Sequence, residues 1–179
     1  MPALHYRLDR WFVRNSLKLS RTFAIVFGLI WGIDGGLKFM GGAVSALPDM
    51  ISSAAAGQPS WLQPWFSFWA SQVSTNPTFW VYLTGVLELA LAFALIAGFM
   101  RKTAYTGGFM LSLFIWAVPE GFGGPYGPTS TDIGTGIVYA MVFLFLLLLN
   151  ATHGTNPYTL DAKIEKKAKW WKTFAELKY

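Results

Sequence analysis

Three ionisable residues lie inside long apolar stretches of this sequence. Asp34 and Lys38 occur four residues apart in GLIWGIDGGLKF, and Glu88 occurs in LTGVLELALAFALIAGF. A carboxylate or an ammonium group is costly inside a membrane, so each of them needs a structural or a functional reason. Because residues four apart share one face of a helix, Lys38 is expected to lie directly beyond Asp34 on the same helix face.

Helical geometry predicts that the three groups lie at similar depths in a bilayer. At a rise of about 1.5 Å per residue, Asp34 lies about 18 Å and Lys38 about 24 Å from the inner end of the first apolar segment. Glu88 lies roughly 16 Å from the same side of a ~30 Å hydrocarbon core. Trp31 shares the face of Asp34, and Trp116 comes out at about 20 Å in a later apolar segment. The two tryptophans are therefore expected to wall the acid–base cluster.

Two interpretations of Asp34, Lys38 and Glu88 are open. In the first, the three residues form an ion-pair and hydrogen-bond clasp that locks two membrane helices together. In the second, they form a proton-linked or ligand-binding site. Two carboxyl groups that share one lysine cannot both ionise cheaply at low dielectric, so one of them is expected to keep its proton. A protonated carboxyl group can donate a hydrogen bond to a carbonyl oxygen, and the neighbouring aromatic rings would suit a flat, apolar quinone.

The composition is that of a membrane protein. Of the 179 residues, 54% are hydrophobic and 13% are charged, against roughly 25% charged residues in soluble domains. The sequence has no cysteine, which excludes disulfides, iron–sulfur ligation, thiolate metal sites and a cysteine nucleophile. His5 and His153 lie outside the centres of the apolar segments, so we expect no haem and no metal site. We also expect no self-sufficient catalytic site in this chain, so any enzymatic role is that of a subunit.

Four apolar segments are long enough, or nearly so, to cross the hydrocarbon core. They are residues 22–40, 79–99, 103–118 and 133–151. The short link between the second and third segments predicts an antiparallel helical hairpin. The predicted fold class is therefore an all-α integral membrane protein, with a bundle of four transmembrane helices in residues 22–151.

Lysine and arginine residues are distributed very unevenly among the connections. Of the fourteen, five lie in residues 1–21, two at 101–102 and six in 152–179, whereas 42–78 and 119–132 contain none. Cytoplasmic segments of membrane proteins are enriched in Lys and Arg. The sequence therefore predicts a multi-pass plasma-membrane protein with both termini in the cytoplasm. The net charge of +5 follows from this topology and does not indicate a nucleic-acid partner.

Three regions outside the predicted spans have basic or aromatic character. Residues 1–21 are expected to form either a short interfacial helix or a solvated basic leader, and the span that follows is expected to be retained as a signal anchor. The outer connection 42–78 contains WLQPWFSFWASQV, whose aromatic spacing predicts an interfacial helix over about 60–73. The tail, residues 152–179, is basic, and its apolar spacing predicts an amphipathic cytoplasmic helix over 160–179.

Two further acids lie near the outer ends of the spans. Asp132 precedes the fourth span, and Ser130, Thr131 or Asp132 is expected to supply the oxygen that caps this helix. Helix capping is favoured over a ligand role for Asp132. Glu120, after the third span, is expected to be solvated.

The chain resembles the DoxX/DoxD family of small four-helix membrane proteins over residues 23–161. The resemblance is carried by GGLKF at 35–39, GVLELALAFALIAGFMRKTAYTGG at 85–108, TDIGTGIVYA at 131–140 and TLD at 159–161. The residues that fall on the family's recurring polar positions are Lys38, Glu88, Arg101, Asp132 and Asp161. Asp34 is selected by its depth alone.

The aromatic segment before Asn76-Pro77 resembles the DoxD branch of the family. For that branch, the resemblance implies the small membrane subunit of a thiosulfate:quinone oxidoreductase in a prokaryotic plasma membrane. It also implies a quinone as ligand and a partner subunit that supplies the redox centre or the sulfur chemistry. The expected function is thus a quinone-interacting subunit of a respiratory or sulfur-oxidising complex, and the alternative is a non-catalytic scaffold or assembly subunit.

Overall fold

The computed structural model describes residues 2–126 and 132–177, with side chains from residue 7 onward in these ranges. All regular structure in the described residues is helical. The α-helices are α1 (Pro2–Leu37), α2 (Ala43–Ala55), α3 (Gln63–Thr75), α4 (Pro77–Ala97), α5 (Arg101–Ala117), α6 (Thr135–His153), α7 (Leu160–Glu165) and α8 (Lys172–Ala175). Three short 3-10 turns are η1 (Ser60–Leu62), η2 (Gly121–Gly123) and η3 (Lys169–Trp171).

Three of the described helices are long and apolar enough to cross a membrane. They are the Arg7–Leu37 part of α1, α4 and α6. Helix α5 covers most of the segment expected to be the third span, but it has 17 residues and begins with Arg101 and Lys102. The described helices therefore indicate an all-helical membrane protein with three candidate spans.

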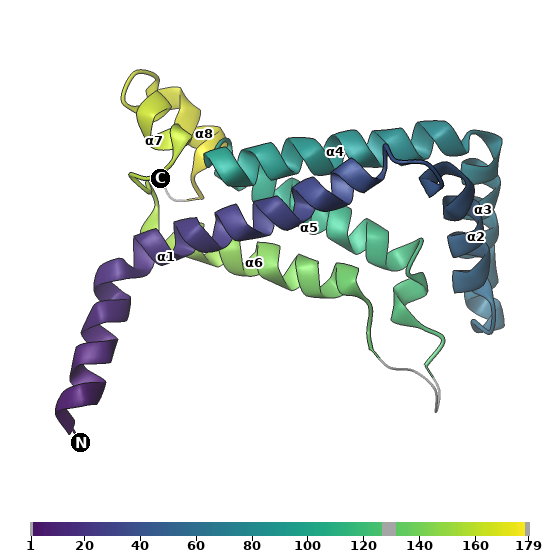
Figure 1. The fold of residues 1–179 in the computed structure, drawn as a ribbon, viewed down its shortest axis with the longest axis horizontal. Helices are drawn as coiled ribbons and strands as arrows, with labels where there is room; N and C mark the ends of the chain where they lie inside the picture. Colours follow the sequence, from purple (N-terminus) through teal and green to yellow (C-terminus); the bar gives the residue numbers. More distant parts are fainter. Residues whose placement is uncertain (1, 127–131, 178–179) are drawn as a thin grey trace.

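The four long helices pack as two antiparallel pairs, α1 with α4 and α5 with α6 (Figure 1). Glycines bring the backbones of the first pair close together. A Cβ atom at Gly28 would lie 2.8 Å from Ile96 Cγ1, and one at Gly35 would lie 3.0 Å from the Leu89 backbone nitrogen. Small residues at such crossings allow membrane helices to pack closely. Gly35 thereby positions the last turn of α1 against the middle of α4.

The interior between the two pairs is apolar and aromatic. Phe27 and Trp31 of α1 lie against Phe143 of α6, with ring centroids 5.0 Å and 5.7 Å apart. Leu91 and Leu95 of α4 complete the buried cluster from the other side. In a bilayer such contacts stabilise the bundle through van der Waals packing.

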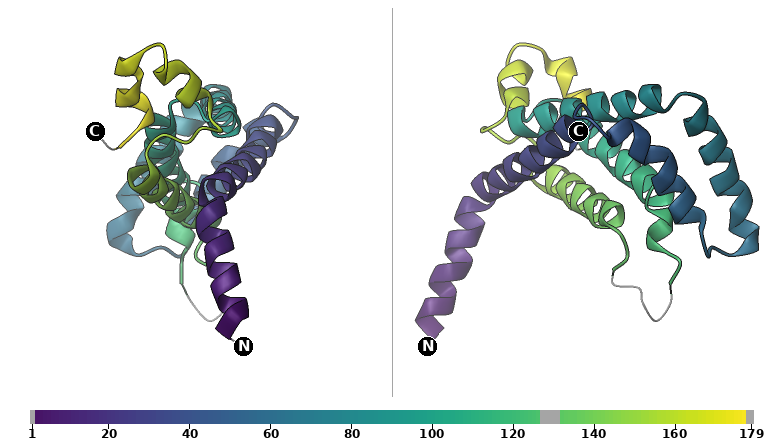
Figure 2. Two further views of the ribbon diagram at one scale, coloured as in Figure 1. Left: turned by 90° about the vertical axis from the view of Figure 1, so that its left-hand side faces the viewer. Right: turned by 45° about the vertical axis from the view of Figure 1, so that its right-hand side comes forward.

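Helices α2 and α3 form a separate layer across one end of the bundle, which we call the α2–α3 end (Figures 1 and 2). Ile51 of α2, Val73 of α3 and Val118 after α5 are buried together there. The aromatic helix expected over 60–73 corresponds to η1 and α3, whereas α2 was not expected. Its Pro48 and the small polar residues around it favoured a loop, and the packing of one apolar face overrides that preference.

Helix α1 continues without a break from the basic N-terminal residues into the first apolar segment. Its first turns project away from the bundle (Figures 1 and 2). Leu8, Trp11 and Phe12 are exposed on this projecting part. The segment expected to be an interfacial helix or a basic leader is therefore helical.

The single amphipathic helix expected over 160–179 does not form in the described part of the tail. Helices α7 and α8, with η3 between them, are short pieces that fold back over the bundle opposite the α2–α3 end (Figure 1). Asp161 and Glu165 turn inward to Arg101 instead of facing water. The Asp161 carboxylate also accepts hydrogen bonds from the N–H groups of Met100 (2.8 Å) and Arg101 (3.0 Å), and so caps α5. We call this region the tail end.

Candidate functional site

Lys38 and Glu88 form an ion pair at the α2–α3 end of the bundle. Lys38 Nζ lies 3.3 Å from Glu88 Oε2. Helix α1 ends at Leu37, so Lys38 lies in the following turn and reaches across to α4. Gly85, one turn before Glu88, makes room for it, because a Cβ atom at Gly85 would lie 2.9 Å from Lys38 Cβ. The end of α1 and a glycine of α4 together set the geometry of the pair.

Asp34 lies beside this pair. Among the described residues, the ion-pair partner of Lys38 is Glu88 and not Asp34. Lys38 was expected to continue the helix face of Asp34. Because α1 ends before Lys38, the lysine side chain leaves that face and approaches Glu88. Asp34 is half-buried and lines the same cavity as the pair. The structure therefore brings the three residues together with the ion pair between α1 and α4.

A cavity of about 220 Å³ adjoins the pair, and we call it the polar cavity. Residues from α1, α2, α4, α5, α6 and the segment after α5 form its walls. The polar lining residues are Trp31, Asp34, Lys38, Glu88, Ser112, Glu120, Thr135 and Tyr139. Four of the residues expected at the site, Trp31, Asp34, Lys38 and Glu88, thus line one cavity.

Three buried polar atoms on the wall of the polar cavity lack a full set of hydrogen-bond partners among the described residues. Trp31 Nε1 and Ser112 Oγ have no partner there, and Glu88 Oε2 has only the Lys38 ammonium group, 3.3 Å away. The three side chains are at most 2% exposed. Most buried polar atoms in proteins are hydrogen-bonded, so these three mark a place where a polar group from outside the chain can bind.

A second cavity, of about 270 Å³, adjoins the other side of the pair. It lies between the end of α1 and helices α2, α3, α4 and α5, and we call it the apolar cavity. Its apolar lining includes Leu47, Ile51, Val73, Trp80, Val81 and Phe114. Lys38 and Glu88 line both cavities, as do Met50, Ile115 and Pro119. The pair is therefore the polar boundary of an apolar chamber, an arrangement suited to a ligand with an apolar body and a polar end.

Trp116 was expected to wall the site but lies elsewhere. Its indole N–H donates a hydrogen bond to the Ile133 carbonyl oxygen (2.8 Å), and its ring centroid is 5.3 Å from that of Phe122. Trp116 lines neither of the two cavities. Trp116 instead links the end of α5 to the segment that precedes α6. The depth of a residue along a helix does not determine the direction in which its side chain points.

Glu120 and Asp132 both bind amides near the start of α6. Glu120 Oε2 accepts a hydrogen bond from the Gly136 N–H, and Asp132 Oδ1 accepts one from the Gly134 N–H, each at 2.8 Å. Glu120 is half-buried instead of solvated, and it supplies the oxygen that binds an amide in the first turn of α6. Asp132 accepts a hydrogen bond from an amide just before the helix begins. The other capping candidates, Ser130 and Thr131, lie outside the described residues.

Sequence reasoning missed Ser112, Glu120 and Tyr139 as cavity residues, and it missed the contribution of α2. A serine within an apolar stretch was a usable signal, because a polar side chain there needs a partner. The roles of Glu120 and Tyr139 depend on how the ends of α5 and α6 approach α1. That approach is a tertiary property that helix periodicity does not encode.

Arg101 and Asp161, the remaining expected polar residues, hold the tail onto the bundle. Arg101 Nε lies 3.1 Å from Asp161 Oδ2, and Arg101 Nη2 lies 3.8 Å from Glu165 and 3.9 Å from Glu176. Arg101 also donates to the Gly154 carbonyl oxygen (3.1 Å). Burial, and then the neighbouring Glu176 carboxyl group, raise the pKa of Glu165. Three carboxyl groups around one buried guanidinium make this cluster a structural clasp.

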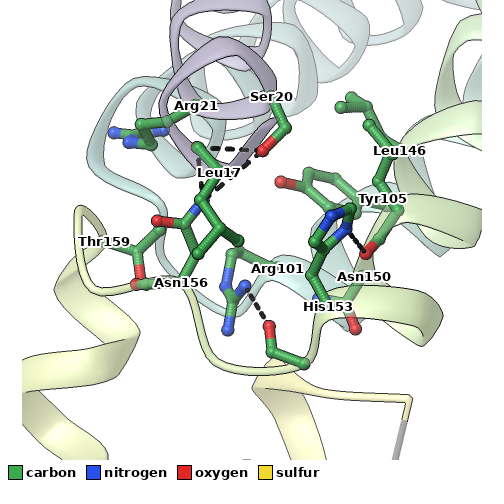
Figure 3. Close-up of a pocket in the computed structure, with 12 residues that line it drawn as sticks. Leu17, Ser20, Arg21, Arg101, Tyr105, Leu146, Asn150, His153, Asn156 and Thr159 are labelled. Carbon is green, nitrogen blue, oxygen red and sulfur yellow. Dashed lines mark hydrogen bonds between the residues drawn. The ribbon is translucent and has the colours of Figure 1, made fainter. Parts of the chain in front are cut away.

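Further hydrogen bonds at the tail end surround a narrow space (Figure 3). Asn156 donates to the Leu17 carbonyl oxygen (2.9 Å). Arg21 donates to the carbonyl oxygens of Leu95 (2.6 Å) and Tyr158 (3.0 Å). The space measures about 20 Å³, which suits a water molecule and not an organic ligand. This narrow space is therefore part of the hydrogen-bond network that joins the segments and not a site for an organic ligand.

Comparisons with known proteins identify no relative that would indicate the roles of these residues. Neither a protein-family model, nor a curated protein, nor a solved structure matches the chain. Among the described residues, no group of three or more His, Cys, Asp or Glu side chains is arranged to hold a metal ion. Interpretation of the site therefore depends on the Lys38–Glu88 pair and on the two cavities that adjoin it.

Proposed function

We propose that this chain is a DoxX/DoxD-like integral membrane subunit of a respiratory or sulfur-oxidising complex and binds a quinone at the Lys38–Glu88 pair. The observation that carries the proposal is the position of the pair between the apolar and polar cavities. A quinone has a flat apolar body and carbonyl oxygens at its ring. The apolar cavity would hold the body, and donors on the polar side would meet the oxygens.

The donors near the pair support recognition of a carbonyl oxygen. The Lys38 ammonium group and the Ser112 hydroxyl each donate hydrogen bonds, and the Trp31 indole can act only as a donor. Trp31 Nε1 and Ser112 Oγ have no partner among the described residues. Glu88, when protonated, would add a fourth donor. A bound quinone would accept two electrons and two protons, and a partner subunit would supply the electrons.

We further propose that α5 is the fourth membrane span and that both termini face the cytoplasm. Helix α5 lies along α6, and its first residues, Arg101 and Lys102, lie at the tail end with the basic tail (Figure 1). Among the described residues, Lys38 is the one Lys or Arg at the α2–α3 end. The distribution of cations supports the placement of the tail end on the cytoplasmic side.

The second candidate function is a scaffold or assembly subunit without a ligand. The observation that favours it is the Lys38–Glu88 pair itself, which links the end of α1 to α4 whether or not a ligand is present. Under this alternative, the replacement of Asp34, Lys38 and Glu88 by Leu, Met and Leu leaves the assembled complex active.

Quinone-dependent turnover of the intact complex tests the proposal. Glu88→Gln preserves the shape of the side chain but removes its acid function, so turnover is expected to be abolished while the complex still assembles. The matched control is Asp49→Asn, because Asp49 is an exposed acid on α2 that lines neither cavity. Unchanged turnover of an assembled Glu88→Gln complex would rule the proposal out.

A further inference from the structure

We infer that the polar cavity is a one-sided aqueous vestibule through which the Glu88 carboxyl group exchanges protons with water at the α2–α3 end. The exchange is an acid–base step alone: the proton that leaves the carboxyl group passes to water, and the carboxylate that remains is balanced by Lys38, 3.3 Å away. A quinone at the pair would gain or lose its protons by the same route. Only this last statement rests on the proposed function.

The exposure of the lining residues changes along the cavity. Trp31, Glu88 and Ser112 are buried at its inner part. Glu120 is half-buried, and Thr135, at the first position of α6, is exposed. Both lie where α5 ends and α6 begins, on the side of α2 and α3 (Figure 1). The lining thus leads from the α2–α3 end inward to Glu88.

The inner part of the cavity offers hydrogen bonds that the chain does not satisfy. Trp31 Nε1 and Ser112 Oγ are buried and have no hydrogen-bond partner in the described part of the chain, and Glu88 Oε2 has only Lys38 beside it. A volume of about 220 Å³ accommodates several water molecules, each of which needs two to four polar partners. The walls meet both conditions, and this distinguishes the cavity from an apolar void, which stays dry.

Ionisable groups from three segments line the cavity together with Glu88, whereas the lining residues of α2 and α5 are not ionisable. Asp34 and Lys38 come from the end of α1, Glu120 from the segment after α5, and Tyr139 from α6. Asp34 and Glu120 are half-buried carboxyl groups on the wall that also holds the buried Glu88 and the exposed Thr135. They provide acceptors for a proton that moves along water between Glu88 and the α2–α3 end.

The route in the opposite direction is closed by the aromatic core. Phe27 and Trp31 precede Asp34 along α1, and Leu91 and Leu95 follow Glu88 along α4, so all four lie on the tail side of the site. Phe143 fills the space between them, 5.0 Å from the Phe27 ring and 5.7 Å from the Trp31 ring. These residues form one buried cluster without a charged member. Proton exchange is therefore confined to the α2–α3 end.

Cysteine accessibility tests the vestibule directly, because the natural sequence contains no cysteine. Ser112→Cys places a thiol of nearly the same size on the inner wall. A membrane-impermeant trimethylammonium methanethiosulfonate is added to one side or the other of membranes that contain the full chain. Thr135→Cys marks the α2–α3 side, and Lys102→Cys marks the tail side. Ala140→Cys is the matched control, since Ala140 is fully buried and lines neither cavity.

Ser112→Cys is expected to react from the α2–α3 side at least ten times faster than Ala140→Cys, and not from the tail side. Reaction from the tail side overturns the inference, as does no reaction from either side while Thr135→Cys is labelled. Ile115→Cys, on the wall of both cavities, replaces Ser112→Cys if that variant is not monodisperse. Labelling does not require a quinone, so one-sided access without quinone binding would contradict the proposed function and leave the vestibule standing.

Discussion

Lys38 Nζ lies 3.3 Å from Glu88 Oε2, although the lysine side chain is 33% exposed and the glutamate side chain only 2% exposed. A half-exposed cation at the end of one helix thus neutralises a buried acid in the middle of another. The pair is the point at which the apolar and polar cavities meet. Experiments can distinguish whether the pair is a clasp or the polar end of a ligand site.

The first prediction separates the two roles of the pair. Lys38→Met removes the cation from a buried carboxylate and is expected to reduce the free energy of unfolding by about 1–3 kcal/mol, less than for a fully buried pair. In the double variant Lys38→Met/Glu88→Leu no buried charge is left, so most of this loss is recovered. Thermal unfolding in detergent measures both. Quinone binding is expected to be lost in Lys38→Met and to stay lost in the double variant. Binding that returns together with stability would show that the pair supports the site only as a clasp.

The second prediction concerns the close approach at Gly85. A Cβ atom there would lie 2.7 Å from Phe39 Cε2 and 2.9 Å from Lys38 Cβ, so Gly85→Ala pushes the end of α1 away from α4. We expect quinone affinity to fall at least ten-fold and stability to fall by about 1–3 kcal/mol. Gly36→Ala is the matched control, because a Cβ atom at Gly36 meets nothing within 4 Å. Equal effects of the two substitutions would contradict this account.

The third prediction concerns the clasp at the tail end. Arg101→Ala leaves the carboxyl groups of Asp161, Glu165 and Glu176 buried without their guanidinium partner. Loss of one partner from a buried ion pair costs about 3–5 kcal/mol, so the tail is expected to detach. Limited trypsin digestion reports this as faster cleavage at the tail lysines. Lys102→Ala, at the next position, is expected to leave the cleavage rate unchanged.

The fourth prediction is a pH dependence of the attached tail. Burial, and then Glu176, raise the pKa of Glu165 in the folded chain. An acid whose pKa is higher in the folded state than in the unfolded state stabilises the fold at low pH, and this contribution is lost as pH rises through the folded pKa. Hydrogen exchange of residues 160–175, corrected for intrinsic rates, should therefore show greater protection at mildly acidic pH than at alkaline pH. Glu165→Gln should reduce this difference, and an unchanged difference would exclude Glu165 as its source.

The helices and the identity of the buried acid and base were accessible from sequence because they depend on local patterns. Apolar length predicts where α4 and α6 lie, and the cost of buried charge identifies Lys38 and Glu88. The partner of Lys38 was not predictable in this way. It depends on the end of α1 at Leu37 and on the space above Gly85, both of which are tertiary in origin.

The tail and α2 show the limit of periodicity in the same way. The tail has an amphipathic pattern, but it folds as the short pieces α7, η3 and α8, and Asp161, Glu165 and Glu176 turn to Arg101. Helix α2 has a loop-like composition, but Ile51 packs against Val73 and Val118. In each case contacts between residues distant in sequence outweigh a local preference of a few tenths of a kcal/mol per residue.

Photolabelling with a reactive quinone tests the central claim most directly. The purified chain is irradiated with an azido-quinone, and the labelled peptides are identified by mass spectrometry with and without excess unlabelled quinone. We predict that competed labels fall on the walls of the apolar cavity, in residues 37–51, 73–88 and 114–119. Labels that are not competed, or that are spread over the lipid-facing surfaces of the helices, would contradict the assignment of a quinone to the Lys38–Glu88 pair.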